Sequence, residues 1–182
     1  MNQLYRIERL KASIDVETYI EEYVNVEEFL ECCKACPNYN NVWSCPPYDF
    51  DVMEYWRQYK TLEIYGIKMI FTQEALNLPP DELAQKSLFA EKRRLTEELW
   101  AEEKKNPGAM SLSAGSCQLC EKCGRPDGIP CVNSECMRYS IESIGGNVGK
   151  TCTKLLRQEL LWCEEGKNPE YYILVGGLLK KW

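Results

Sequence analysis

The stretch Tyr171-Tyr-Ile-Leu-Val-Gly-Gly-Leu-Leu179 decides the fold, because it is an almost wholly apolar run near the end of the chain. A short apolar run without polar alternation predicts a strand that is buried on both faces, as a central strand is. A second apolar run, residues 62–71, is the clearest strand elsewhere, and Gly66 within it indicates a bulge or a close approach. The two runs predict a sheet at the centre of a small α/β core.

Helical patterns lie on either side of these strands. Asn25 with Glu28 forms a capping-box pattern, which predicts a short amphipathic helix that ends at residues 36–37. Asp49 or Asp51 caps a second helix, and an early strand is expected at residues 12–19.

Two further helices are predicted in the second half of the chain. Residues 79–81 begin a long charged helix that continues to about residue 105, where Asn-Pro-Gly stops it. Another helix is expected from about residue 151 to 163, with Cys152 and Cys163 on the same apolar stripe as its leucines. These two cysteines are therefore predicted to belong to the core.

Four cysteines lie in one short segment, Cys117-Gln-Leu-Cys120-Glu-Lys-Cys123 followed by Cys131. Two C-x2-C steps in tight turns bring three sulfurs to neighbouring corners of one small cluster, and a return of the chain supplies the fourth. The intervening residues 124–130 are rich in turn formers, whose backbone amides can hydrogen-bond the sulfurs and tune the cluster. The spacing therefore predicts a [4Fe–4S] cluster.

Tetrathiolate zinc is the alternative for this segment. Zinc ribbons place two C-x2-C pairs on separate knuckles, and the second pair is missing here. The bacterial ferredoxin run has its fourth cysteine after three residues and then a proline, whereas here Pro130 precedes Cys131. The geometry of that ferredoxin is therefore not predicted, and Cys136 is either a substitute ligand or a bystander.

A second block comprises Cys32, Cys33, Cys36 and Cys45. Cys32 and Cys36 are an i, i+4 pair that can point together, and two prolines hold the chain after Cys45. These three predict a second metal site, either a second cluster with one iron left open or a zinc with an outside ligand, and plain burial is the competing interpretation. Cys33 shares a helical face with apolar residues, which favours a buried apolar thiol.

The chain contains no histidine among its 182 residues. This absence excludes a Ser-His-Asp or Cys-His catalytic arrangement, Rieske ligation and Cys2His2 zinc. Any metal must therefore be held by thiolate, carboxylate or backbone oxygen. Glu121 and Glu142 lie near the cysteines, but the sequence assigns them no role.

Composition bounds the partners and the compartment. A formal net charge of −6 argues against nucleic acid or an anionic membrane as a partner. No apolar signal core and no segment of membrane-spanning length is present in the sequence. Eleven cysteines in C-x2-C clusters without a signal indicate metal ligation in a reducing cytoplasm rather than a disulfide framework.

The run Gly145-Gly-Asn-Val-Gly-Lys-Thr151 is similar to a phosphate-binding loop. That loop needs a glycine at the position of Ile144 and a preceding strand, and both are missing from the sequence pattern. The favoured interpretation is a glycine-rich turn that begins a helix.

The predicted fold class is accordingly α/β (α+β), a small mixed sheet with flanking helices and an inserted cysteine-rich iron–sulfur loop. Residues 1–182 are expected to form a single domain, and residues 111–140 are the metal-binding loop inserted before the last helix and strand.

Three patterns together resemble a known family. They are Cys32-x3-Cys36-Pro-Asn-Tyr-x4-Ser-Cys45-Pro-Pro, Ala-Gly-Ser-Cys117-x2-Cys120-x2-Cys123 with Cys131, and Arg138-x-Ser140-x-Glu142-x2-Gly145. The family is that of cysteine-rich "predicted metal-binding proteins", a domain of unknown function of anaerobic bacteria and archaea, and the likeness runs from about residue 25 to the end. It implies metal binding, with iron–sulfur chemistry, by both blocks. Asn147 stands where the family has an aspartate.

The leading hypothesis is a cytoplasmic iron–sulfur protein that passes electrons to or from a redox partner protein. The first alternative is a metal-dependent enzyme with an open metal position at Cys32, Cys36 and Cys45. The second is a protein in which zinc or another metal is structural and only pins a long loop.

Overall fold

The apolar run near the end of the chain forms β4 (Tyr171–Lys180) in the computed structural model, which describes residues 4–164 and 166–182. β4 lies between β2 (Thr61–Phe71) and the short β3 (Met110–Leu112), and β1 (Tyr5–Asp15) pairs with the other edge of β2. The predicted central strand and the α/β class are thus confirmed, with every pairing between these strands antiparallel.

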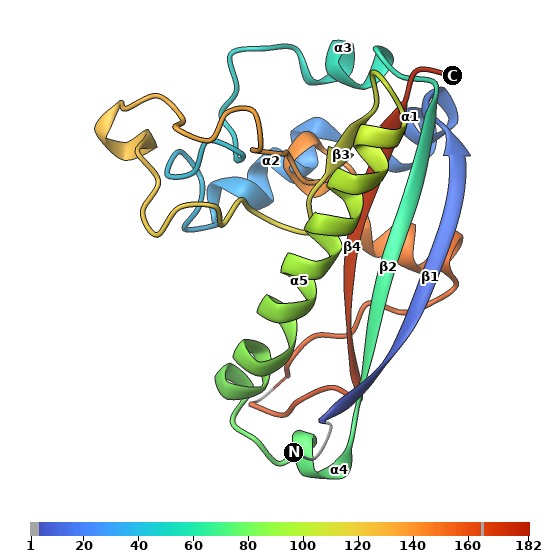
Figure 1. The fold of residues 1–182 in the computed structure, drawn as a ribbon, viewed down its shortest axis with the longest axis vertical. Helices are drawn as coiled ribbons and strands as arrows, with labels where there is room; N and C mark the ends of the chain where they lie inside the picture. The colour runs from blue at the N-terminus through green and yellow to red at the C-terminus, as the bar shows by residue number, and fades with distance from the viewer. Residues whose placement is uncertain (1–3, 165) are drawn as a thin grey trace.

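Helices cover both faces of the sheet (Figure 1). The long helix α5 (Pro80–Lys105) begins and ends as predicted, and its Leu95 and Leu99 pack with Ile67 of β2 in one apolar cluster. On the other face, Trp56 of α3 (Val52–Arg57) packs with Ile64 of β2. Because side chains alternate along a strand, β2 supplies both clusters, and little of it can be exposed.

Glycines allow the closest contacts with the sheet. A Cβ atom added to Gly176 would lie 2.7 Å from Leu99 Cδ1 and 2.9 Å from the Leu112 carbonyl oxygen. A Cβ atom on Gly66 would lie 3.0 Å from both Leu10 Cβ and Leu156 Cδ1. Gly66 is therefore a point of close approach, one of the two roles predicted for it, and the strand register continues through it without a bulge.

The N-terminal strand differs from its prediction. It spans Tyr5–Asp15, and α1 (Val16–Tyr23) begins where the predicted strand should have continued to Tyr19. The physical reason is a cap, because Asp15 Oδ1 accepts hydrogen bonds from the amides of Glu17 and Thr18 at 3.0 and 3.2 Å.

The next two helices, α2 (Val26–Lys34) and α3, have the predicted caps. Asn25 Oδ1 accepts the Glu28 amide at 3.2 Å, and the Glu28 carboxylate accepts from Asn25 Nδ2 at 2.9 Å. Asp51, one of the two proposed caps, accepts the amides of Met53 and Glu54. A single-turn helix, α4 (Gln73–Leu76), follows β2.

The predicted helix at residues 151–163 is much shorter in the structure. The helical chain runs through α6 (Val148–Thr151) and the π-helical turn η3 (Cys152–Leu156), and Asn147 caps it. Arg157 then adopts a left-handed conformation with φ 55°, and its amide donates to the Cys152 carbonyl, which ends the helix. Cys152 is buried as predicted, but Cys163 lies beyond this turn and is exposed, so its assignment to the core was wrong.

The cysteine-rich segment leaves the sheet after β3 and returns before the short turn η2 (Glu142–Ile144), and it projects to one side of the molecule (Figure 1). Its two ends meet at a neck, where the Ser113 amide donates to the Tyr139 carbonyl at 2.8 Å. Ser113 and Ser140 form an isolated parallel β-bridge at this neck.

A largely buried ion pair closes this neck. Arg138 donates to Glu103 of α5 through Nε at 2.9 Å and Nη2 at 2.5 Å, and the two side chains are 13% and 16% exposed. The amide and hydroxyl of Ser111 in β3 donate to Glu103 Oε2 at 2.8 and 2.6 Å. One carboxylate thus joins the helix, the sheet and the cysteine-rich segment. No helix in the described part of the chain is both long and apolar enough to cross a membrane.

We expect Glu103→Gln to lower the free energy of unfolding by about 1–3 kcal/mol near pH 7, because a charge-assisted and mostly buried pair is lost. Burial opposes ionisation of Glu103, but hydrogen bonds from Arg138 and Ser111 outweigh it and hold its pKa below the ordinary value. A depressed pKa stabilises the fold above the unfolded value of about 4.3, and this stabilisation is lost as the pH falls through the folded value.

The difference between wild type and Glu103→Gln should therefore shrink on acidification below about pH 4. Urea unfolding at several pH values measures it. Glu102→Gln, whose partner Lys105 is exposed, is the control and should change stability by no more than about 0.5 kcal/mol. If the two variants lose the same free energy of unfolding at neutral pH, the pair of Arg138 with Glu103 does not stabilise the neck.

Candidate metal centre

The four thiols Cys117, Cys120, Cys123 and Cys131 lie in irregular backbone and are all partly exposed. Burial raises the pKa of the Cys117 thiol, and the negative charges of Cys131, Cys120 and Cys123 raise it further. Each of these three sulfurs is therefore near enough to Cys117 to interact with it electrostatically. The fold thus leaves the other three thiols within electrostatic range of Cys117.

Two N–H groups are directed at these sulfurs. Asn133 Nδ2 donates to Cys120 Sγ over 3.1 Å. The backbone amide of Leu119 hydrogen-bonds Cys117, which opposes the rise in the pKa of that thiol. Donors of this kind stabilise thiolates and tune the potential of a metal cluster that thiolates hold. Asn133 was not singled out from the sequence, where only its nearness to Cys131 could have indicated it.

The N-terminal block is arranged around Cys45, which is buried. Burial, together with the nearby Cys36 and Cys33, raises the pKa of the Cys45 thiol to about 11. Cys32 and Cys36 are exposed on and just after α2. Cys32 interacts electrostatically with its neighbour Cys33.

Cys33 is not the buried apolar thiol that was predicted. It is partly exposed, and burial together with Cys36, Glu142 and Cys32 raises its pKa. The helical face it shares with Phe29 and Leu30 is only partly covered, because none of the residues of α2 is fully buried. Cys33 therefore belongs with Cys36 and Cys45, and the i, i+3 step from Cys33 to Cys36 was the sequence signal for it.

Neither block forms a ready pocket for a single ion. In residues 4–164 and 166–182, no three cysteine, aspartate or glutamate side chains are gathered as ligands of one metal ion. Cys136, the substitute ligand considered above, is exposed.

The two blocks are in contact, although some 80 residues separate them in the sequence. Arg125, in the short turn η1 (Arg125–Asp127), donates to the carbonyls of Val42, Cys45 and Pro47. Its guanidinium lies over the Trp43 ring at 5.1 Å. One arginine of the C-terminal block therefore holds the backbone on both sides of Cys45.

Two more hydrogen bonds join the blocks. Trp43 Nε1 donates to the Ile129 carbonyl at 2.9 Å, and the Cys117 amide donates to Ser44 Oγ at 2.9 Å. Ser44 Oγ is also 4.0 Å from Cys45 Sγ. The two segments that carry the eight cysteines are thus held against each other, and we call this region the composite site.

A charged pair lies beneath this composite site. Lys92 of α5 donates to the Ser116 carbonyl at 2.6 Å, and burial lowers its pKa, whereas the charges of Glu142, Cys117 and Cys45 act in the opposite direction. Burial raises the pKa of Glu142, and Lys92 opposes that rise. Glu142 also lines a cavity of about 190 Å³ with Pro46 and Tyr48. Glu121 is exposed.

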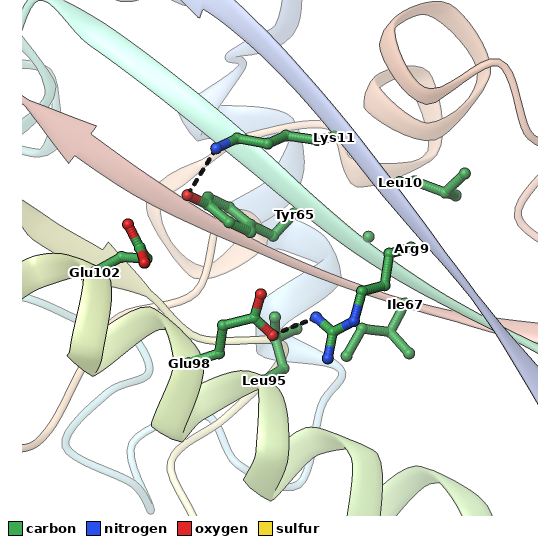
Figure 2. A pocket seen from close by; sticks show the side chains of 9 residues that line it. Arg9, Leu10, Lys11, Tyr65, Ile67, Leu95, Glu98 and Glu102 are labelled. Carbon is green, nitrogen blue, oxygen red and sulfur yellow. Dashed lines mark hydrogen bonds and ion pairs between the residues drawn. The ribbon is translucent and has the colours of Figure 1, made fainter.

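A separate cleft of about 310 Å³ lies between α5 and the strands β1 and β2 (Figure 2). Its charged side chains face one another, with Arg9 bonded to Glu98 and Lys11 Nζ bonded to the Tyr65 hydroxyl at 3.0 Å. No cysteine lines this cleft, so it is not connected with the thiols.

Comparison with known proteins agrees with this chemistry. The family model described as "Predicted metal-binding protein (DUF2284)" matches residues 18–179. No curated protein and no solved structure matches the chain.

We expect Arg125→Ala to loosen the chain around Cys45, because three carbonyls lose their donor. Local opening should become easier by about 1–2 kcal/mol, which corresponds to an increase of roughly tenfold in the alkylation rate of the Cys45 thiol. Iodoacetamide labelling of the metal-free protein, followed by mass spectrometry of the Cys45 peptide, measures the rate.

Lys122→Ala is the matched control for this experiment. Lys122 lies in the same segment and forms an exposed pair with Asp127 at 3.1 Å. Its loss should leave Cys45 labelling unchanged. Equal protection of Cys45 in wild type and Arg125→Ala would show that Arg125 does not hold the two blocks together.

Proposed function

Because the chain belongs to the DUF2284 family of predicted metal-binding proteins, we propose that Cys117, Cys120, Cys123 and Cys131 hold a [4Fe–4S] cluster. The observation that supports the proposal is that N–H donors are directed at two of these sulfurs and that the other three thiols lie within electrostatic range of Cys117. The chain offers no imidazole ligand, and thiolates are the ligands that such clusters require. When bound, the cluster supplies a one-electron carrier.

The chain's own residues have two tasks in this proposal. Asn133 and the Leu119 amide stabilise negative charge on the sulfurs, which favours the reduced cluster. Arg125 and the pair of Arg138 with Glu103 hold the segment against the body of the protein. A fixed frame of this kind limits the reorganisation that accompanies a change of charge.

We propose that the electrons pass to or from a partner protein. Three large apolar side chains of the cysteine-rich segment are exposed, Leu119 by 40%, Ile129 by 51% and Val132 by 79%. Apolar side chains exposed beside a cofactor suit a transient protein contact, because they release water when the partner docks. The free state of all eleven cysteines accords with the reducing cytoplasm that we propose as the compartment.

Protein purified without oxygen should be brown and contain about four iron and four sulfide per chain at the C-terminal block. Cys120→Ser should lose most of the visible absorbance, because it removes a ligand. Cys163→Ser is the control, since that exposed thiol lies outside both blocks. Colourless protein with stoichiometric zinc would contradict the proposal and favour the structural zinc alternative.

A second candidate function, a metal-dependent enzyme, has one observation in its favour. The cavity lined by Glu142, Pro46 and Tyr48 begins at the residue that follows Cys45, although no cysteine lines it. The enzyme hypothesis requires that a substrate in this cavity reach a metal held by Cys32, Cys36 and Cys45. A catalytic metal site keeps one position open, and three protein ligands leave such a position. Cys33 extends the set of thiols that could take part.

Cys45→Ser should remove the metal of the N-terminal block and leave the visible absorbance of the C-terminal cluster in place. Metal analysis and absorbance of the same preparation measure the two effects separately. Cys163→Ser again serves as the control. If Cys45→Ser keeps the full metal content of the wild type, Cys45 is not a metal ligand and this enzyme hypothesis is wrong.

A further inference from the structure

A cavity of about 470 Å³ lies between α5 and the base of the cysteine-rich segment. Its volume falls within the range of small-molecule sites, about 300–1,000 Å³. The residues that matter for its chemistry are Phe89, Lys92, Arg93 and Trp100 of α5 and Cys117 and Leu119 of the segment. The proposed function uses Cys117 and Leu119 of the cavity wall, but it assigns no ligand to the cavity itself.

The apolar part of the wall is exposed without a partner in the fold. Phe89 and Leu119 are two of the large hydrophobic side chains that are exposed in the described chain, and both line this one cavity. Exposed phenylalanine and leucine lose contact with water when an apolar body enters between them. The wall therefore favours an aromatic or branched aliphatic group.

The charge of the cavity is positive in a protein of net charge −6. Glu103 balances Arg138 at the wall, and Lys92 already donates to the Ser116 carbonyl. Arg93 is exposed and has no ion pair among the described residues. Glu97, one turn further along α5, also lines the cavity and disfavours a ligand with several negative charges.

The wall also contains a donor that lacks an acceptor. The indole Nε1 of Trp100 is buried and has no hydrogen-bond partner among the described groups. Such a group costs free energy until an acceptor satisfies it. A carboxylate oxygen in the cavity could serve as that acceptor after a small rotation of the ring, of the kind that accompanies many binding events.

From these features we infer that the cavity binds a small organic monocarboxylate with an aromatic or branched aliphatic body. The carboxylate pairs with Arg93 and accepts from Trp100, and the apolar body lies between Phe89 and Leu119. The inference goes beyond the proposed function and does not depend on it, because none of these four residues is a proposed metal ligand.

Benzoate is the probe, and protein purified without oxygen is titrated with it by calorimetry. Benzyl alcohol has the same ring without the charge, and acetate has the charge without the ring. Benzoate should bind saturably, and both controls should bind at least about tenfold more weakly, because each lacks one of the two recognised features. Equal binding of benzyl alcohol, or no saturable benzoate binding at millimolar concentrations, would overturn the inference.

Variants locate the binding. Arg93→Gln should weaken benzoate binding about threefold to fivefold, because an exposed charged partner contributes up to about 1 kcal/mol. Lys104→Gln makes the same change of charge at an exposed position of the same helix outside the cavity, and it should leave binding unchanged. Equal weakening in the two variants, or none in Arg93→Gln, would contradict the site.

The indole N–H resonance of Trp100, assigned with Trp100→Phe, gives a second readout on the wild-type protein. It should move on addition of benzoate and stay in place with acetate, and no movement at saturating benzoate would contradict the assignment of Trp100. Iron analysis of the same samples separates failure of this site from failure of the cluster, because benzoate can bind whether or not the cluster is present.

Discussion

The ion pair between Arg138 and Glu103 is the constraint on which the arrangement of the thiols depends. It is mostly buried, so water screens it little, and Ser111 adds two hydrogen bonds to the same carboxylate. Ser111 pairs with β4, and Glu103 lies in α5, which packs against that strand. The cysteine-rich segment is therefore anchored at its base to the sheet and to the helix that packs on it, although the segment itself contains almost no regular structure.

The second constraint is the contact between the two cysteine blocks. Burial is the main reason that the pKa values of Cys33, Cys45 and Cys117 rise, and the repulsion between neighbouring thiolates raises them further. Lys92 lies close enough to interact with both Cys45 and Cys117. A cation at this position favours thiolate on either side and so favours metal binding by either block.

The regular elements provide the frame and the irregular segments carry the chemistry. Long loops are tolerated thermodynamically because closing them costs little more than closing short ones, provided that their ends are held. Here the neck holds one segment, and Arg125 ties the other to it. The same division leaves apolar side chains such as Val132 exposed, because no sheet or helix is near enough to cover them.

Several elements could be predicted because their signals are local. The central strands have unbroken apolar runs, Asn25 and Asp51 cap helices within their own turns, and the cysteine spacing groups Cys117 with Cys120. Prediction failed where a single residue redirects the chain, as at Arg157, which ends a helix whose apolar stripe continues to Cys163. It also failed for Cys33, whose face was apolar in sequence but is only partly covered in space.

The sequence by itself determined the two central strands, the helix caps and the grouping of the cysteines by spacing, because these signals act over a few residues. Only the tertiary structure decided that Arg125 reaches the Cys45 carbonyl, that Lys92 and Glu142 lie beneath both blocks, and that a cavity opens beside Cys117. These contacts join segments that are far apart in the chain. They form only after the strands have paired into the sheet and α5 has packed against it, and no local sequence pattern predicts that arrangement.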